Sequence, residues 1–574
     1  MAQSLVIPPR RHNARGLIEQ LLNEQQLLTP VADFARKQDR SEIGAGGGNF
    51  RKLLPMTPLK PGEQYAFEVE LNKCSGCKAC VTACHSLNGL DDDETWRDVG
   101  LLISRSTQRP ERSQATNSPT QSRFTDRQTR EIGPSALLQH VTTSCHHCVD
   151  PACLNGCPVL AYAKDPVTGI VRHLDDQCIG CQYCVLKCPY DAPKYNARLG
   201  IVRKCDLCAN RLAGGEAPAC AQACPNEAIR ITRVSKTEVS LAFREQSATF
   251  LPGAPGGAYT LPTTRYVTSA MIERDEKNLA DATPRLVSPL ILGAADDTTH
   301  RPQPAHWPLV IMLVLSQASV GLTLAALFKV TPGPLLRLAL TLGAASAAAG
   351  VSHLGRPLGA WRCFLGIKTS WLSREILVFG LYVPLLGVAV AGPAIGLLWL
   401  GENIRAIATV AALVGLAGVY CSVMIYHDTR RILWHARHSA GFFFGTVTIF
   451  AVAAACTTAD PVGLPRTLIS LTVLAKVALE ISVIRHRRDY ELTPLKKTAL
   501  IVTGCFQSLA LTRVVCAFLG GIGLPLLLHA SAFGSRQAVV AWLAFTFLFA
   551  GEILERLLFF RAVDAPKMPG GLAP

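Results

Sequence analysis

The sequence of 574 residues is poor in charge, and its first half lacks long apolar runs. Charged residues make up 17% of the chain and hydrophobic residues 49%, which is high for a soluble protein. Almost all long apolar runs lie after residue 306, so the chain has parts of different character. The net charge of +15 lacks the interleaved aromatic residues of a nucleic-acid-binding face, which argues against a nucleic-acid partner.

The N-terminus shows no export signal. Arg10 and Arg11 form a twin arginine, but no apolar run follows them. Residues 16–36 instead have the pattern of an amphipathic helix broken at Pro30, and we expect this segment to dock as an arm. We therefore expect no targeting segment in this part of the chain.

Four runs of four cysteines lie between Cys74 and Cys224. They are Cys74-Cys77-Cys80-Cys84, Cys145-Cys148-Cys153-Cys157, Cys178-Cys181-Cys184-Cys188 and Cys205-Cys208-Cys220-Cys224. Runs one and three have the C-x2-C-x2-C-x3-C spacing of bacterial ferredoxins, in which the fourth cysteine ligates a different cluster. Sixteen cysteines therefore predict four [4Fe-4S] clusters.

Zinc and disulfides are the alternatives to iron. Paired C-x2-C motifs suit zinc, but three ligands at this pitch leave a zinc tetrahedron locally incomplete. Cysteines in tight triplets are poorly placed for disulfides, and nothing in the sequence indicates an oxidising compartment. Iron–sulfur clusters are the favoured interpretation.

A nested ferredoxin arrangement predicts which cysteines share a cluster. Runs one and four would exchange their last cysteines, and so would runs two and three. The predicted sets are Cys74, Cys77, Cys80 and Cys224; Cys84, Cys205, Cys208 and Cys220; Cys145, Cys148, Cys153 and Cys188; and Cys157, Cys178, Cys181 and Cys184.

The expected fold is an α+β ferredoxin-like domain followed by an all-α membrane domain of eight transmembrane helices. The expected regions are a partly helical extension (1–65), the iron–sulfur domain (66–234) with a polar insertion (102–132), a linker or strap (235–305) and the membrane anchor (306–574). Tyr65–Leu71 alternates enough to predict a short strand.

Eight apolar segments of membrane-spanning length predict that both ends of the membrane domain lie on one side. They are 307–328, 334–353, 374–394, 405–427, 438–457, 465–484, 498–526 and 537–560. Gly520-Gly521 and Pro525, near the end of the seventh segment, favour its break into two pieces. The loops on the iron–sulfur side carry more Lys and Arg than the opposite loops, which predicts that this side faces the cytoplasm. Export of a folded iron–sulfur subunit on a partner's signal would reverse this orientation.

The charged residues inside the predicted membrane segments include Lys476, Glu480, Arg513 and Glu552. Intramembrane charges are costly, and they are usually functional or mutually paired. Lys476 and Glu480 are four residues apart, so a local pair within one helix is one interpretation. A proton path that includes Glu552 is the other.

The soluble part resembles the four-cluster iron–sulfur subunit of the dimethyl sulfoxide reductase family of molybdopterin enzymes. The stretches that carry the resemblance are CSGCKACVTACHSLNG, CHHCVDPACLNGCPVLAYAKDPVTGIV, CIGCQYCVLKCPYDAPKYN and CDLCANRLAGGEAPACAQACP. HLGRPLGAWRCFLGIKTSWLSREI, MIYHDTRRILW and GEILERLLFF are similar to the family's membrane anchor subunit. These subunits are usually separate chains, whereas this sequence resembles a fusion of the two.

The resemblance implies a quinone site at His353 and Glu375, with Arg356, Trp361, Trp371 and Arg374 in the same loop region. A histidine can hydrogen-bond a quinone carbonyl, and a carboxylate can pass its protons. A structural alternative is that His353 caps a helix and Glu375 pairs with Arg374. The histidines show no buried pair that would hold a haem, so we expect none.

The resemblance also implies a function and partners. The chain would pass electrons between membrane quinone and a molybdopterin catalytic subunit, which is a separate protein, so this chain would hold no catalytic residue of its own. A sulfite dehydrogenase-like and a dimethyl sulfoxide reductase-like direction both remain open, and orientation favours the first. A redox-driven ion-translocating subunit is the alternative from a different class. The expected location is the cytoplasmic membrane.

Overall fold

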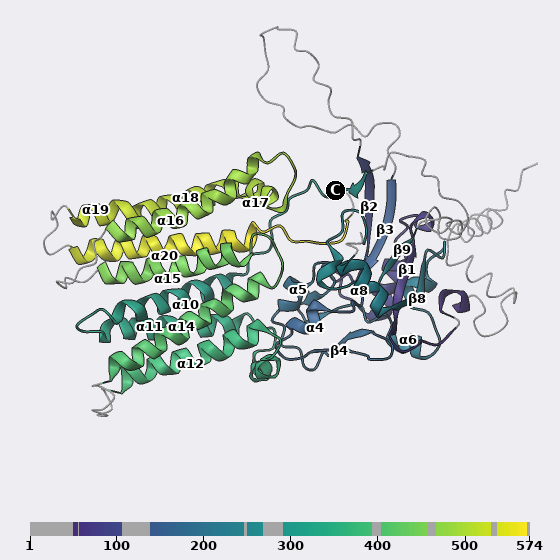
Figure 1. Ribbon diagram of the computed structural model, residues 1–574, viewed down its shortest axis with the longest axis horizontal. Helices are drawn as coiled ribbons and strands as arrows, with labels where there is room; N and C mark the ends of the chain where they lie inside the picture. The colour runs from purple at the N-terminus through teal and green to yellow at the C-terminus, as the bar shows by residue number, and fades with distance from the viewer. Residues whose placement is uncertain are drawn as a thin grey trace, which may run out of the picture.

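The computed structural model describes residues 50–55, 57–105, 138–245, 250–267, 291–392, 403–456, 467–529 and 537–570. A long helical bundle forms one end of the molecule and a domain of short strands and helices the other (Figure 1). The expected arm at residues 16–36 lies outside the described residues.

Two three-stranded sheets frame the smaller domain. In the first, β1 (Glu63–Glu70) lies between antiparallel β8 (Ile229–Ser235) and parallel β9 (Arg265–Val267). In the second, β2 (Arg97–Arg105) lies between antiparallel β10 (Ile291–Ala294) and β3 (Leu138–Ser144). The predicted strand at Tyr65–Leu71 is thus β1. Most of its side chains are buried, so they do not alternate between buried and exposed as in a strand with one face in solvent.

Short elements carry the cysteine runs between these sheets. The hairpins are β4 (Tyr162–Lys164) with β5 (Val171–His173) and β6 (Lys194–Asn196) with β7 (Ile201–Arg203). The helices are α3 (Ala79–Asn88), α4 (Ala152–Gly156), α5 (Tyr183–Lys187), α6 (Ala209–Ala213), α7 (Ala219–Gln222) and α8 (Lys236–Arg244). Ser235 begins α8 as its N-cap, accepting a hydrogen bond from the backbone N–H of Glu238 (3.3 Å).

Two of the expected region limits differ from the structure. Residues 102–105, which the sequence assigns to the polar insertion, are the end of β2, and residues 106–137 lie outside the described residues. Residues 235–305 are more than a linker, because α8 packs on β8 and the strands β9 and β10 extend both sheets. Backbone pairing therefore fastens this segment to the iron–sulfur domain as a strap.

The bundle contains seven helices that are long and apolar enough to cross a membrane, counted among the described residues. They are α10 (Trp307–Ala326), α11 (Gly333–Ser352), α12 (Trp371–Ala391), α14 (Ile404–His427), α15 (Ala436–Cys456), α16 (Thr467–Ile484) and the segment Gln507–Leu527. The eighth expected segment is α20 (Gln537–Arg561), which is more charged toward its end and packs against α10, α15 and α18.

The seventh expected segment is interrupted in a different place from the one predicted. It begins with α17 (Pro494–Thr503) and resumes as α18 (Gln507–Phe518), so the break lies at residues 504–506. At Gly520-Gly521 the chain continues through a π-helical turn (Leu519–Gly523) into α19 (Leu524–His529). Gly521 is needed there because an added Cβ would clash with Val473 of α16.

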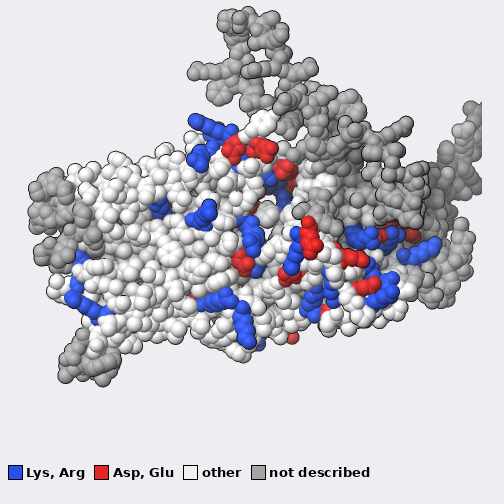
Figure 2. All heavy atoms as spheres, viewed as in Figure 1, with Lys and Arg blue, Asp and Glu red and all other residues white. Residues whose placement is uncertain are grey.

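The surface of the bundle carries few charged residues over most of its length. On the face that Figure 2 shows, most of the bundle surface is uncharged, whereas Lys, Arg, Asp and Glu gather on the smaller domain and at the junction. Large apolar side chains such as Leu413, Leu471 and Leu511 are exposed on the bundle. An exposed apolar belt of this extent fits contact with lipid.

Both ends of the helical bundle lie at its junction with the iron–sulfur domain. The backbone N–H of Gln303, before α10, donates to the carbonyl of Arg561 at the end of α20 (2.9 Å). The C-terminal segment then runs onto β2, where Leu101 N donates to the carbonyl of Gly570 (3.2 Å). Gly100 has no room for a Cβ, because the Pro569 carbonyl occupies that space. This tail ties the end of the bundle to the second sheet.

Candidate iron–sulfur and quinone sites

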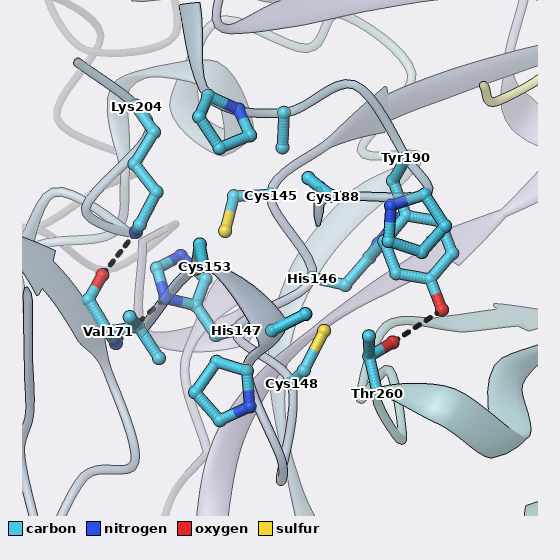
Figure 3. Close-up of a pocket in the computed structure, with 15 residues that line it drawn as sticks. Cys145, His146, His147, Cys148, Cys153, Val171, Cys188, Tyr190, Lys204 and Thr260 are labelled. Atoms are coloured by element: carbon cyan, nitrogen blue, oxygen red, sulfur yellow. Dashed lines mark hydrogen bonds between the residues drawn. The ribbon is translucent and has the colours of Figure 1, made fainter. Parts of the chain in front are cut away.

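Cysteines from two separate runs line one cavity in the iron–sulfur domain. The cavity has a volume of about 370 Å³, and the four cysteines around it are Cys145, Cys148, Cys153 and Cys188 (Figure 3). The strap closes it, because the hydroxyls of Tyr190 and Thr260 are hydrogen-bonded at 2.8 Å. Lys204 lies at the opposite side and donates to the carbonyl of Val171.

Two similar cavities gather further cysteines. One, of about 300 Å³, is lined by Cys74, Cys77, Cys80 and Cys224, and the other, of about 280 Å³, by Cys157, Cys178, Cys181 and Cys184. The remaining four cysteines, Cys84, Cys205, Cys208 and Cys220, lie near one another, as their mutual electrostatic interactions show. We call the four groups cages one to four: cage one holds Cys74, cage two Cys84, cage three Cys145 and cage four Cys157.

The cages form a row because short helices are shared between neighbours. Helix α3 carries Cys80 of cage one and Cys84 of cage two. Cys205 of cage two interacts electrostatically with Cys145 of cage three. Helix α5 carries Cys184 of cage four and leads directly into Cys188 of cage three. The row runs from cage one, where Cys77 is exposed, to cage four at the bundle.

The geometry of the cages fits a cluster better than a single ion. Among the described residues, no three His, Cys, Asp or Glu side chains converge closely enough to hold one metal ion. Four thiolates on a [4Fe-4S] cube stand farther apart than four thiolates on zinc, since each binds a different corner. Burial raises the pKa of the Cys157 thiol to about 11.

A repeated backbone turn directs amide donors at the cysteines that precede proline. The third residue after the cysteine is left-handed in all three Cys-Pro runs, at Leu160, Asp191 and Glu227. The following alanine N–H then points back at the sulfur: Ala161 N lies 3.2 Å from Cys157 Sγ, and Ala228 N lies 3.3 Å from Cys224 Sγ. Such bonds tune cluster potentials. The Cys-Pro-x-x-Ala pattern is the sequence signal for this turn.

Run one has no proline after its last cysteine, and a side-chain amide rather than a backbone amide lies near that sulfur. Helix α3 continues past Cys84, and the Asn88 side-chain amide lies 3.6 Å from its sulfur.

Two buried cations that the sequence analysis did not single out also adjoin the cages. Arg97 lies near cysteines of cages one and two, and Lys204 near cysteines of cages two and three. Both side chains offset negative charge where cages meet.

The loop between α11 and α12 fastens the bundle directly to cage four. Arg356 N donates to the carbonyl of Ile179 (3.0 Å), and Gly366 N to that of Pro158 (2.9 Å), so both bonds reach residues next to cage cysteines. The Ser370 hydroxyl donates to the carbonyl of Gly156 (2.8 Å). Gly180, Gly200 and Gly355 pack backbone against backbone, and a Cβ on any of them would clash with a neighbour.

His353 lies at the C-terminal end of α11, beside cage four. Its backbone caps α11, and its ring lies against the backbone of Cys181. The ring Nε2 is buried and has no hydrogen-bond partner among the described residues. The ring of His306 faces it edge-on, with 6.0 Å between centroids. The backbone of His353 therefore provides the cap, and the ring Nε2 keeps its hydrogen-bonding capacity.

Glu375 and Arg374 point to different partners. The buried Glu375 carboxylate accepts a hydrogen bond from the Ser422 hydroxyl of α14. Arg374 donates to the carbonyls of Ile367 (3.0 Å) and Lys368 (2.8 Å), and its guanidinium lies over the Trp371 ring at 4.3 Å. The alternative in which these two residues pair is wrong.

Arg356 faces the iron–sulfur domain rather than Glu375. It donates to the carbonyls of Leu199 (3.3 Å) and Asp175 (2.9 Å). Trp361 is exposed at the edge of the same loop. Of the residues expected at the quinone site, Arg356 and Arg374 therefore hold the loop, while His353 and Glu375 keep chemically available groups.

The intramembrane charges form one network across three helices. Lys476 binds the carboxylates of Glu552 and Glu555 on α20, the latter at 3.4 Å. Arg513 binds Glu480 and Glu552, both at 2.9 Å. The local pair of Lys476 with Glu480 is therefore wrong, because helix packing offers Lys476 two carboxylates on another helix. Glu555 and Arg556, which pair at 3.4 Å, were missed by the sequence analysis although they follow Glu552 by three and four residues.

A second bridge between bundle and iron–sulfur domain was also missed. Lys187 of α5 donates to the Asp428 carboxylate at 2.5 Å, and the hydroxyl of Tyr183 donates to it at 3.3 Å. Tyr259 of the strap donates to the Asp428 backbone carbonyl (2.9 Å). Asp428 stands in the MIYHDTRRILW stretch, but its partner helix could not be identified without the fold.

Two family models match the two parts of the chain. Residues 137–234 match a 4Fe-4S dicluster domain, and residues 303–561 match the DMSO reductase anchor subunit (DmsC). The first match covers the cysteines of runs two to four, and the second covers the bundle together with its charge network.

Curated relatives match the iron–sulfur part. The B component of sulfite dehydrogenase from Allochromatium vinosum is 36% identical over 193 residues, which are 32% of this chain and 75% of the relative. The B component of anaerobic dimethyl sulfoxide reductase from Haemophilus influenzae is 36% identical over 167 residues, 29% of this chain and 73% of the relative. The thiosulfate reductase electron transfer subunit PhsB of Salmonella typhi is 35% identical over 177 residues, 31% of this chain and 79% of the relative.

The two matched regions lie on one polypeptide, and they coincide with the two parts that the sequence and the fold distinguish. The cysteine-rich domain corresponds to the electron-transfer subunits, and the apolar bundle corresponds to the anchor. The chain is an integral membrane protein and belongs to the dimethyl sulfoxide reductase family, as a fusion of its iron–sulfur electron-transfer subunit with its membrane anchor subunit.

Proposed function

We propose that the chain carries electrons between membrane quinone and a molybdopterin catalytic subunit through four [4Fe-4S] clusters, one in each cage. The observation that carries this proposal is the unbroken row of cages from exposed Cys77 to the loop at residues 353–370. The clusters would supply one-electron transfer when bound, and the protein's own groups set their spacing, burial and hydrogen bonding. The catalytic subunit would dock at the cage-one end.

The quinone would bind beside cage four, where His353 offers an unpartnered buried nitrogen. Quinone exchange couples electrons to protons, so a titratable group must lie at the end of the electron path. His353 Nε2 would hold a quinone carbonyl, and Glu375 would exchange protons with it. Trp371 and Arg374 would keep the loop in place.

The membrane domain would cross the bilayer eight times. The hydrogen bond between Gln303 and the carbonyl of Arg561 joins the start of α10 to the end of α20, which supports an even number of crossings. Lys329 and Arg405 lie together at the far end, where Arg405 donates to the Lys329 carbonyl (3.2 Å). The excess of basic loop residues lies on the cage side, so the cages would face the cytoplasm from the cytoplasmic membrane.

A cytoplasmic orientation favours a sulfite dehydrogenase-like complex that delivers electrons to quinone. A relative carries that name, while two others are named for dimethyl sulfoxide and thiosulfate reductases, which would receive electrons from quinol. The redox-driven ion-translocating alternative gains no support from the charge network, whose ions pair with one another.

Electron paramagnetic resonance on membranes containing the native complex tests the function and its direction. Sulfite added to oxidised membranes should produce the reduced [4Fe-4S] signal if electrons enter from the catalytic subunit. Dimethyl sulfoxide added to quinol-reduced membranes should instead remove the signal if the chain feeds a terminal reductase. A chain that binds no [4Fe-4S] cluster, or whose clusters exchange electrons neither with a quinone analogue nor with a quinol analogue, would contradict the proposal.

A further inference from the structure

The second half of the bundle contains a cavity whose lining includes no residue of the loop that contacts cage four. Its empty volume is about 630 Å³, which includes the space open to the surroundings, and it lies among α15, α16, α17, α18 and α20. Most of the residues that line it are aliphatic or aromatic, and the polar ones are Glu480, Thr498, Arg513 and Glu555. Ile481 and Val514, which also line it, are exposed on the surface of the bundle. We call it the α16–α18 cavity.

Arg513 and Thr498 both line this cavity, and both carry buried donor atoms that have no hydrogen-bond partner among the described residues. Arg513 is 1% exposed, and its Nε and Nη1 have no partner among the described residues, although Nη2 binds Glu480 and Glu552. The hydroxyl of Thr498 on α17 is also buried and has no partner there. Unpaired donors in an apolar interior are costly, so an acceptor supplied by a ligand would account for both.

The charges of the neighbouring ion network indicate which kind of acceptor a ligand would present. Lys476, Arg513 and Arg556 are cations, and each pairs with one or more of the carboxylates of Glu480, Glu552 and Glu555. Three cations beside three carboxylates leave no net charge to attract an anion. The unused donors therefore suit a neutral oxygen, such as a carbonyl.

We propose that the α16–α18 cavity binds an uncharged, carbonyl-bearing molecule from the lipid phase, whose oxygen accepts hydrogen bonds from Arg513 and Thr498. A quinone ring and a phospholipid acyl ester both present this chemistry. The apolar walls would hold the body of the molecule, which enters between Ile481 and Val514. This site is separate from the one at His353 and does not depend on the proposed function.

Photoaffinity labelling of the purified complex in lipid nanodiscs tests the site. One arm uses an azido-ubiquinone and the other a phosphatidylethanolamine with a photoreactive acyl chain, and labelled peptides are identified by mass spectrometry. Labelling of peptides from α16 or α18 by the first probe supports the proposal with quinone as the ligand, and labelling by the second supports it with lipid. The absence of labelling by both probes overturns it.

Two adjacent residues provide a matched pair of variants. Val514 lines the cavity and Val515 does not, although their side chains are similarly exposed at 43% and 47%. V514W should lower labelling at least tenfold, and V515W should leave it unchanged. Equal labelling in the two variants overturns the proposal, because it would mean adsorption to the outer surface.

Thr498→Val tests the hydrogen bond while keeping the shape of the side chain. Loss of one donor should weaken labelling about tenfold at low probe concentration. Unchanged labelling would remove Thr498 from the site and leave the donor argument without its second group, which overturns the proposal as stated. Retention of the iron–sulfur absorbance and of the melting temperature shows that each variant is folded.

Discussion

The two halves of the membrane domain treat buried polar groups in opposite ways. In α10–α14, the His353 ring has a free nitrogen and the Glu375 carboxylate has one hydroxyl partner, Ser422. In α15–α20, the buried ions are gathered into one network and neutralise one another. Buried groups that keep free capacity are suited to ligands, whereas mutually paired ions hold helices together. The charged groups of the first half are thus suited to chemistry, whereas the ion network of the second half holds helices together, apart from the Arg513 donors beside the α16–α18 cavity that have no partner within the described part of the chain.

The largest expected effect is on stability, in the second half. Lys476→Met leaves Glu552 and Glu555 buried without their shared cation, and we expect a loss of about 3–5 kcal/mol in the free energy of unfolding. The melting temperature of the purified complex measures it. The double variant Lys476→Met/Glu552→Gln should recover part of the loss. If the single variant melts like the native protein, the network does not stabilise the bundle.

The next effect is on activity, in the first half. His353→Leu should lower quinone-linked turnover about a hundredfold, because the group that holds the quinone and assists its protons is lost. The reduced [4Fe-4S] signals should remain, which separates loss of quinone chemistry from loss of clusters. His438→Leu, in the second half, is the control, since His438 also has a buried unpartnered nitrogen. Equal losses in both variants would erase the distinction between the halves.

A smaller effect should appear as a dependence of stability on pH. Burial, with the nearby His353 and Arg431, lowers the pKa of His306 to about 4, below its ordinary value of 6.5. The unfolded chain then binds a proton between pH 6.5 and 4 that the folded chain does not, so stability falls as pH falls through this window. The loss should reach a few kcal/mol at most. His306→Phe should flatten the melting temperature over this range, and an unchanged slope would assign it to other groups.

The smallest expected effects are the losses of stability when one of two buried hydroxyls, that of Ser422 or that of Thr446, is removed. Ser422→Ala removes the single hydroxyl donor to Glu375 and should cost about 1 kcal/mol. Thr446→Val should cost more, about 1.5–3 kcal/mol, because Thr446 bridges Lys476, Glu552 and Arg556. Chemical unfolding of the two variants under one condition provides the measurement. A larger loss for Ser422→Ala would reverse the roles assigned to the halves.

The sequence predicts the architecture well where local spacing determines it. The cysteine runs specify a ferredoxin-like domain, and the structure brings the cysteines together in the sets that the nested arrangement predicts. The apolar segments likewise predict the helices. The break at residues 504–506 was missed because glycine is common in membrane helices, so Gly504 by itself does not indicate a break.

Long-range partners could not be predicted because they depend on helix packing. Lys476 reaches α20 rather than Glu480, and Asp428 reaches α5 of the iron–sulfur domain. Nothing within a few residues of either side chain specifies these contacts. The amide donors to Cys157 and Cys224 had a local signal in the Cys-Pro-x-x-Ala pattern, but its meaning required the left-handed residue that precedes each alanine.

The tail that returns from α20 to β2 affects how the protein is assembled. In a complex of separate subunits, an anchor and an electron-transfer subunit meet at a rate and with an occupancy that depend on their amounts. Here the strap before α10 and the tail at Gly570 tether the same two surfaces at both ends of the bundle. The local concentration of one surface at the other is then fixed by the tether, at about millimolar for short linkers. One-to-one stoichiometry is therefore encoded in the chain and is independent of expression level.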